Sequence, residues 1–186
     1  MAAATQYEID LTAEAAANII GLGLPEAMAV LFPQHPHLHS DIQAAYAAHY
    51  VPRSQQTRLF EGVEALLQQL QKQGVILAVA TGKSRAGLDR VLADSGIADY
   101  FSVTRCASET RSKPHPQMLQ EILEVTGITA ADAVMIGDTS YDLEMAQRIA
   151  MPRIGVSYGV HTAERLQQYQ PLAVVSQMAE LAVLLR

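Results

Sequence analysis

The sequence predicts an α/β protein with a doubly wound, Rossmann-like parallel sheet and a small α-helical subdomain. Short apolar runs alternate with helical patterns from Glu61 to the end of the chain. This alternation is typical of parallel strands joined by right-handed crossover helices. Residues 1–52 differ, because they consist of alanine-rich helical segments joined by the loop "PQHPHLHS".

The first part of the α/β region alternates helix, strand, helix and strand. The segment "GVEALLQQLQKQG" at 62–74 places apolar residues at helical spacing and ends on a glycine. The unbroken run "VILAVA" at 75–80 indicates a strand buried on both faces, as in a parallel sheet. A helix is expected over 84–96, followed by a weaker strand at 101–104.

The pattern continues to the end of the chain. Pro114 and Pro116 open a helix that ends at Gly127, and "AVMIG" at 133–137 is the next strand. A helix follows that strand. Two short strands are then expected in "RIGVS" and "LAVV" (172–175), separated by a helix around "TAERLQQY". A last helix covers "MAELAVLL".

Composition limits the class of protein. With 186 residues, 49% hydrophobic and 17% charged, the chain is neither disordered nor fibrous. A net charge of −6 argues against a general nucleic-acid binder, and no apolar run reaches membrane-spanning length. The start lacks the features of a secretory signal, and the single cysteine fits a reducing compartment. We therefore expect a cytoplasmic globular protein without nucleic-acid or membrane partners.

Chemically suggestive residues follow the predicted strands. Ligands of open α/β sheets collect at the carboxyl ends of the strands. Thr81-Gly82 offers a hydroxyl and backbone amides at a helix start, which suits an anion. Lys113, in the proline-stiffened loop "SKPHP", could neutralise a phosphate, and Asp138 and Asp142 are oxygen ligands of the kind that Mg²⁺ takes. Together they predict a site for a phosphoryl group bound to a metal ion.

Each of these features also has a purely structural interpretation. Thr81-Gly82 could be only a capped turn, Lys113 a solvated surface charge, and the two aspartates charges at a helix start. Their order and spacing in one α/β frame favour the phosphate–metal site.

Longer stretches resemble a known family. "LAVATGKSR", "SKPHPQML" and "VMIGDTSYDLEMA" resemble the haloacid dehalogenase (HAD) superfamily of hydrolases, close to phosphoglycolate-phosphatase-like members with a helical cap. "LFEGVEALLQQL" and "IIGLGLPEAMAVLFP" support the resemblance. It implies a HAD-like core over 53–186, a helical cap over 1–52, and a hinge at "PRSQQTR" (52–58).

The resemblance also implies roles for the site residues. Thr81 and Lys113 would be the catalytic groups that bind the phosphoryl oxygens, with Gly82 beside them. Asp138 would ligate Mg²⁺, and Asp142 would assist directly or through water.

The sequence departs from the family pattern at its start. Family members begin with a strand that ends in Asp-x-Asp-Gly-Thr and carries the nucleophile, a motif that this sequence does not contain. The resemblance therefore implies that the first central strand, between 75–80 and 133–137, is missing. Residues 5–11 would bury Glu8 and Asp10 if they filled its place, so we expect an altered or partner-completed sheet and self-association.

The functional expectation has a lead and two alternatives. The lead is a Mg²⁺-dependent phosphatase of a small phosphorylated metabolite, impaired in this chain because the nucleophile that forms the aspartyl-phosphate is absent. A non-catalytic phosphate- and metal-binding or regulatory protein is the first alternative. A chain without a function of its own is the second.

Overall fold

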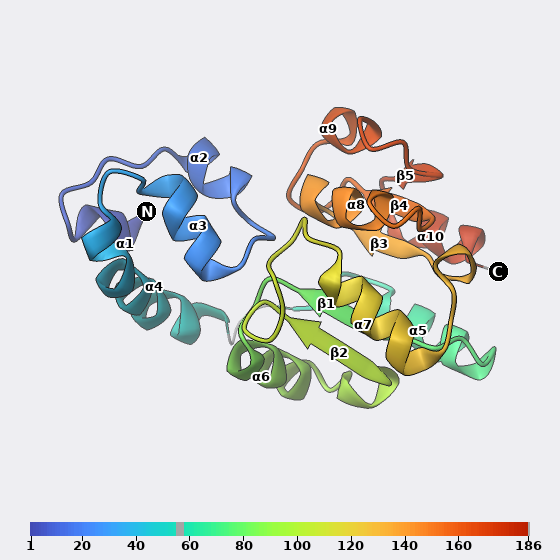
Figure 1. Cartoon of the computed structure of the whole chain (residues 1–186). Coiled ribbons are helices and arrows are strands. Elements are labelled where there is room, and N and C mark those ends of the chain that lie inside the picture. The colour runs from blue at the N-terminus through green and yellow to red at the C-terminus, as the bar shows by residue number, and fades with distance from the viewer. Residues whose placement is uncertain (55–57, 186) are drawn as a thin grey trace.

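The computed structural model describes residues 1–54 and 58–185. Helices near the N-terminus form a separate group at one end of the molecule (Figure 1). They are α1 (Ala2–Thr5), α2 (Ala13–Asn18), α3 (Leu24–Leu31), the 3-10 helix η1 (Pro36–Leu38) and α4 (His39–Ser54). They enclose an apolar cluster of their own, made of Ala3, Ala4, Ala27, Met28, Phe32 and Ile42.

The boundary of this helical part was predicted at residue 52, and α4 continues to Ser54. The predicted hinge at 52–58 includes residues 55–57, which lie outside the described residues.

The rest of the chain alternates strands and helices in the predicted order. The strands are β1 (Ala78–Thr81), β2 (Val103–Cys106), β3 (Met135–Gly137), β4 (Arg153–Val156) and β5 (Ala173–Val175). The helices are α5 (Val63–Lys72), α6 (Arg85–Ser95), α7 (Gln117–Thr126), α8 (Ser140–Gln147), α9 (Ala163–Gln167) and α10 (Met178–Leu184), with the 3-10 helices η2 (Ala98–Tyr100) and η3 (Ala130–Asp132). The predicted α/β class is confirmed.

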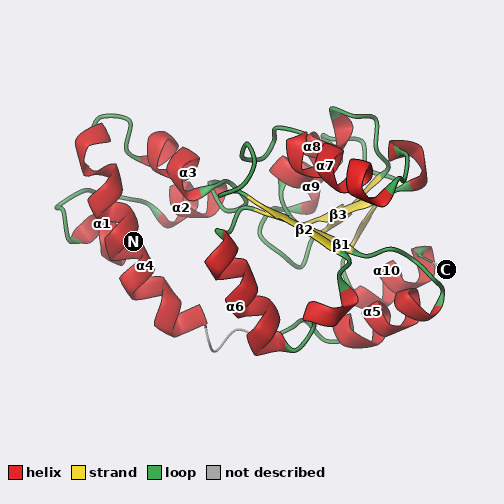
Figure 2. Ribbon diagram, turned by 60° about the horizontal axis from the view of Figure 1, so that its bottom comes forward, coloured by secondary structure: helices red, strands yellow, loops and turns green. Residues whose placement is uncertain are grey.

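The helices cover both faces of the strands, as in a doubly wound fold. Figure 2 shows α7 and α8 on one side of the strands and α5 and α10 on the other. On the α5 and α10 side the core consists of Leu66, Leu70, Ile154, Val156, Val175 and Leu181. On the α7 and α8 side it consists of Met118, Leu119, Met145, Ala146 and Met151.

The strands divide into two parallel sheets within the described residues. One pairs β1 with β2, with Ala78 opposite Val103, and the other has the order β3-β4-β5. β1 and β3 are therefore each paired along one edge only, which agrees with the strand expected to be missing between them. Residues 5–11 do not take its place, because Tyr7, Ile9 and Leu11 pack against the cluster of the helical part.

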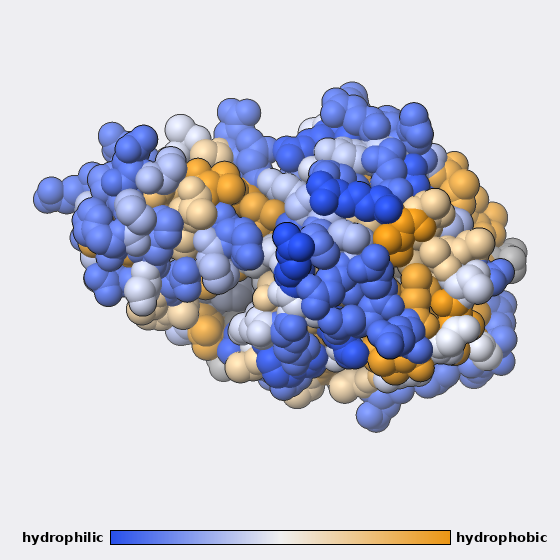
Figure 3. Space-filling model, viewed as in Figure 1, coloured by the Kyte–Doolittle hydropathy of each residue, from blue (hydrophilic) through white to orange (hydrophobic). Residues whose placement is uncertain are grey.

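Apolar side chains are exposed along the segments that flank this position. Val75 and Ile76 before β1 are 45% and 47% exposed, and Val134 and Ile136 are 38% and 36% exposed. Figure 3 shows apolar side chains gathered near the end of α7 and the segment leading into β3. No helix among the described residues is long and apolar enough to span a membrane.

Because unpaired strand edges with exposed apolar side chains favour association between chains, we expect the protein to self-associate. Light scattering after gel filtration should give a mass above the 20.1 kDa of one chain, rising with concentration. The substitution Ile136→Lys should lower this mass. Val30→Lys, at a 60%-exposed position on α3, should not. A mass of one chain at every concentration would contradict the expectation.

Candidate functional site

Three loops at the carboxyl ends of the strands carry the predicted site residues. β1 ends at Thr81, and the Thr81 hydroxyl accepts a hydrogen bond from the amide of Lys83 at 3.2 Å. Lys113 lies in the loop between β2 and α7, and Asp138 directly follows the last residue of β3. Thr81 and Asp138 are half-buried, whereas Lys113 is buried.

A buried ion pair joins the second loop to the third. Lys113 Nζ donates to Asp142 Oδ1 at 2.5 Å, and the two side chains are only 6% and 5% exposed. Asp142 Oδ2 accepts from the amide and the hydroxyl of Thr139, at 3.1 and 2.7 Å, in the capping box that starts α8. Lys113 is therefore not a solvated surface charge, and both Asp142 oxygens are engaged by the protein.

Two glycines allow the acidic side chains to lie close to the backbone. A Cβ on Gly137 would lie 2.2 Å from Asp142 Cβ, and one on Gly159 would lie 2.2 Å from Asp138 Cβ. Asp138 Oδ2 accepts from the amide of Val160 at 3.0 Å. Larger residues at either glycine would displace a carboxylate.

The charges of the site act on one another. The pKa of Asp138 is raised, chiefly because burial disfavours its charged form and also because Asp142 is negative. Lys113 and the backbone hydrogen bonds oppose this rise. Lys113, Asp138 and Asp142 thus lie within electrostatic reach of one another.

A short segment of the helical part, Gly21–Gly23, touches all three loops. A Cβ on Gly82 would lie 2.6 and 2.5 Å from the carbonyl oxygens of Gly21 and Leu22. The Gly23 amide donates to Ser112 Oγ at 2.7 Å, next to Lys113. A Cβ on Gly21 would lie 2.9 Å from Thr139 Oγ1. The loops that carry Thr81, Lys113 and Asp138 therefore meet at one place, next to the Gly21–Gly23 segment of the helical part.

A cavity of about 340 Å³ opens beside Lys113. Loop residues 111–115 line it together with Glu26 and Arg148. The pKa of His115 is lowered, first by burial and then by the positive charges of Arg111 and Arg148. The cations Arg111, Lys113 and Arg148 outnumber the acidic Glu26 in this lining, which suits an anionic ligand.

Sequence analysis missed His161, which is 5% exposed. Its Nδ1 accepts from the Ser140 amide at 2.8 Å, and its own amide donates to the carbonyl of Asp138 at 3.0 Å. Nε2 has no hydrogen-bond partner among the residues that the structure describes. His161 follows β4, and a position after the carboxyl end of a strand was the available signal for a site residue. A single histidine in a sequence is weak evidence for such a role.

The carboxylates differ in how they fit a metal ion. The described ranges contain no group of three or more His, Cys, Asp or Glu side chains that could hold one. Asp142 is committed to Lys113 and Thr139, whereas Asp138 contacts the backbone. Mg²⁺ is often held by one or two carboxylates with waters and substrate phosphate, so Asp138 fits as such a ligand. Direct or water-mediated help from Asp142 stays a prediction.

Comparison with known proteins finds a matching family and several proteins that are similar in sequence. Residues 1–156 match the family described as haloacid dehalogenase-like hydrolase. The chain is 37% identical over 123 residues to the probable phosphatase IndB of Dickeya dadantii, covering 66% of the chain and 54% of that protein. It is 34% identical over 128 residues to the phosphoglycolate phosphatase of Pectobacterium atrosepticum, covering 68% and 55%. The chain thus spans little more than half the length of these relatives.

Solved structures share the fold. A hydrolase from Pseudomonas syringae superposes with a TM-score of 0.90 at 18% identity, covering 99% of the chain and 87% of that structure. A predicted phosphoglycolate phosphatase from Haemophilus somnus gives a TM-score of 0.82 at 21% identity, covering 99% and 87%.

The buried ion pair should dominate the response to substitution. Lys113→Met leaves the Asp142 carboxylate buried without a counter-ion, so it should lower the free energy of unfolding by about 3–5 kcal/mol. The double variant Lys113→Met/Asp142→Asn should lose less, because it also removes that charge. Chemical denaturation measures both.

The control is the more exposed pair between Arg148 and Glu144, in which a guanidinium contacts a carboxylate at 2.6 Å. Glu144→Gln should change stability by no more than about 0.5 kcal/mol. If Lys113→Met costs no more than this control, the buried pair does not hold the loops together.

Proposed function

Because the chain belongs to the family of haloacid dehalogenase-like hydrolases, we propose that its sheet edge binds the phosphoryl group of a small phosphorylated metabolite together with Mg²⁺. The buried Lys113 carries this proposal. Its ammonium is held at the carboxyl edge of the sheet by Asp142, 29 residues further along the chain. Buried and paired in this way, Lys113 offers a fixed positive charge beside the loop that carries Asp138.

Each group has a role in binding. The Thr81 hydroxyl and the Gly82 amide would bind phosphoryl oxygens, and Lys113 would neutralise their charge. An ammonium group has three donors, so Lys113 can keep its bond to Asp142 while it binds an anion. Asp138 would hold Mg²⁺, which when bound would neutralise charge on the phosphoryl oxygens. Asp142 would act by orienting Lys113.

The class of ligand follows from the relatives and from the cavity. Relatives carry the name phosphoglycolate phosphatase, and the 340 Å³ cavity is lined by Arg111, Lys113 and Arg148 with Glu26 as its acidic residue. Both support a small metabolite with more than one negative charge. The single cysteine, which is free and buried, supports the expectation of a cytoplasmic protein.

Turnover needs a nucleophile as well as a binding site. The sequence contains no Asp-x-Asp-Gly-Thr motif to supply an attacking carboxylate. We therefore propose that this chain turns over phosphomonoesters slowly or not at all. A second function, phosphate and metal binding without turnover, is favoured because the sequence keeps Thr81, Lys113 and Asp138 without that motif.

The turnover proposal is tested by hydrolysis. With Mg²⁺ present, the chain should hydrolyse small phosphomonoesters no faster than its Asp138→Asn variant, because the binding groups alone leave only residual catalysis. Robust turnover that disappears in Asp138→Asn would show that a nucleophile is present, and Asp10 would be the first residue to examine.

The binding proposal is tested by calorimetric titration with inorganic phosphate. Loss of a hydrogen bond to a charged group costs about 1.5–3 kcal/mol, so Lys113→Met should weaken binding roughly tenfold or more. Thr81→Val keeps the side-chain shape and should weaken binding less. Lys72→Met, on the exposed face of α5, should bind as the unmodified chain does. Equal affinities for all four proteins would refute the site, and circular dichroism verifies that each variant is folded.

A further inference from the structure

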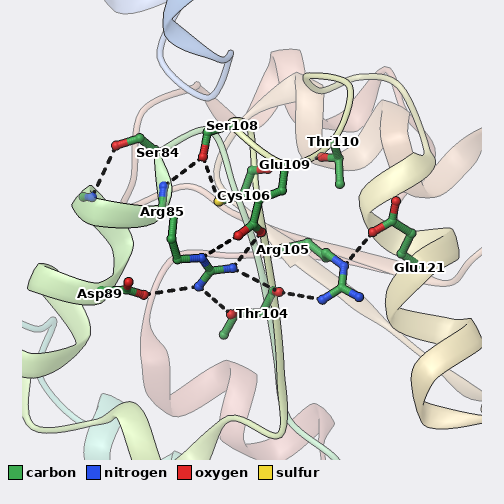
Figure 4. Close-up of polar contacts among 11 residues, drawn as sticks. Ser84, Arg85, Asp89, Thr104, Arg105, Cys106, Ser108, Glu109, Thr110 and Glu121 are labelled. Carbon is green, nitrogen blue, oxygen red and sulfur yellow. Dashed lines mark hydrogen bonds and ion pairs between the residues drawn. The ribbon is translucent and has the colours of Figure 1, made fainter.

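Arg85 and Glu109 form an ion pair that joins the first residue of α6 to the loop after β2 (Figure 4). Arg85 Nε lies 2.7 Å from Glu109 Oε1, and Nη2 lies 2.7 Å from Oε2. Such a two-pronged contact fixes direction as well as distance, because both groups are planar. The partners are 24 residues apart in the sequence.

Backbone contacts run beside this ion pair. The Arg85 amide donates to Ser108 Oγ at 3.0 Å, and the Ala107 amide donates to the Lys83 carbonyl at 3.0 Å. Arg85 Nη1 also donates to Thr104 Oγ1 at 2.9 Å on β2. Residues 83–85 are therefore tied to residues 107–109 at several points.

The two tied segments belong to the loops of the site. Thr81 and Gly82 immediately precede residues 83–85, and Lys113 lies four positions after Glu109. A contact that fixes these segments relative to each other also limits how far Thr81 can lie from Lys113. No other element needs to transmit this restraint, because each segment continues directly into a binding loop.

A contribution to the stability of the fold does not explain why an arginine stands at position 85. It is the first residue of α6, whose first turn has no acidic side chain, and a cation near a helix N-terminus is unfavourable. Glu109 supplies the missing negative charge from another loop. The side chains are 35% and 37% exposed, and exposed ion pairs contribute little to stability. The geometric tie between the loops is the larger effect.

We propose that Arg85 and Glu109 are positioning residues that set the spacing of Thr81 and Lys113 for a phosphoryl group. This inference rests on the proposed phosphate site. Hydrogen bonds from Arg85, the largest influence, lower the pKa of Glu109 to about 2, so the ion pair stays charged throughout the neutral and mildly acidic range.

The test compares two acids that contact the same arginine. Glu109→Gln removes the charge that bridges the loops. Asp89→Asn removes the negative charge from the contact at 3.2 Å within α6 and leaves the pair with Glu109 intact. We expect Glu109→Gln to weaken the binding of inorganic phosphate about fivefold or more, and Asp89→Asn to change it less than twofold. The thermal midpoint should move little in either variant, which separates positioning from loss of fold.

Hydrogen exchange supplies a readout that does not depend on phosphate. In Glu109→Gln the amides of Ala107 and Arg85 should exchange faster, while that of Gly127, which donates to Leu123 at the end of α7, should not change. Faster exchange at all three would indicate general loosening and overturn the proposal.

The remaining outcomes test the positioning role of Arg85 and Glu109 separately from the proposed phosphate site. Equal phosphate affinity in Glu109→Gln and the unmodified chain, or equal weakening in both variants, would overturn the positioning role. If the unmodified chain does not bind phosphate, the proposed function fails. Hydrogen exchange then tests whether the ion pair holds the two segments together. If the amides of Ala107 and Arg85 exchange equally fast in Glu109→Gln and in the unmodified chain, it does not.

Discussion

The buried ion pair between Lys113 and Asp142 is the contact on which the rest of the site depends. Removing both charges from water is costly, and the cost is offset only by good geometry and further hydrogen bonds. Thr139 supplies those bonds, and Gly137 leaves room for the carboxylate. Asp142 is thus both the N3 residue of the capping box and the counter-ion of Lys113, so the start of α8 and the loop of Lys113 have to form together.

Around this pair, the loops of the site are held in place by contacts with one another and with the helical part. The Gly21–Gly23 segment of the helical part packs on the loops of Gly82, Ser112 and Thr139. The ion pair between Arg85 and Glu109 also ties the first two of these loops to each other. Within the described residues β1 and β3 lie in separate sheets, so strand pairing does not tie the loop of Gly82 to that of Thr139. The relative positions of the loops at the carboxyl ends of the strands are therefore set mainly by contacts between the loops.

The sequence could predict the elements because alternating apolar runs and helical spacing are local signals. The resemblance to haloacid dehalogenase-like hydrolases implied the unpaired position between β1 and β3. The residues that follow the predicted strands singled out Thr81, Lys113, Asp138 and Asp142. The strand expected at 75–80 begins only at Ala78, because an apolar run does not reveal where pairing with β2 starts. The pairing of Lys113 with Asp142, the bridge at Glu109 and the burial of His161 could not be predicted. Each depends on which loops meet in space.

The central claim is that the loops of Thr81, Lys113 and Asp138 form one site for a phosphoryl group and a divalent cation. Anomalous diffraction from crystals soaked with tungstate, a phosphate analogue, and with Mn²⁺ tests it most directly. The account predicts a tungstate peak beside Lys113 and Thr81 and a manganese peak beside Asp138. A tungstate peak elsewhere on the molecule, with no density at Lys113, would contradict it.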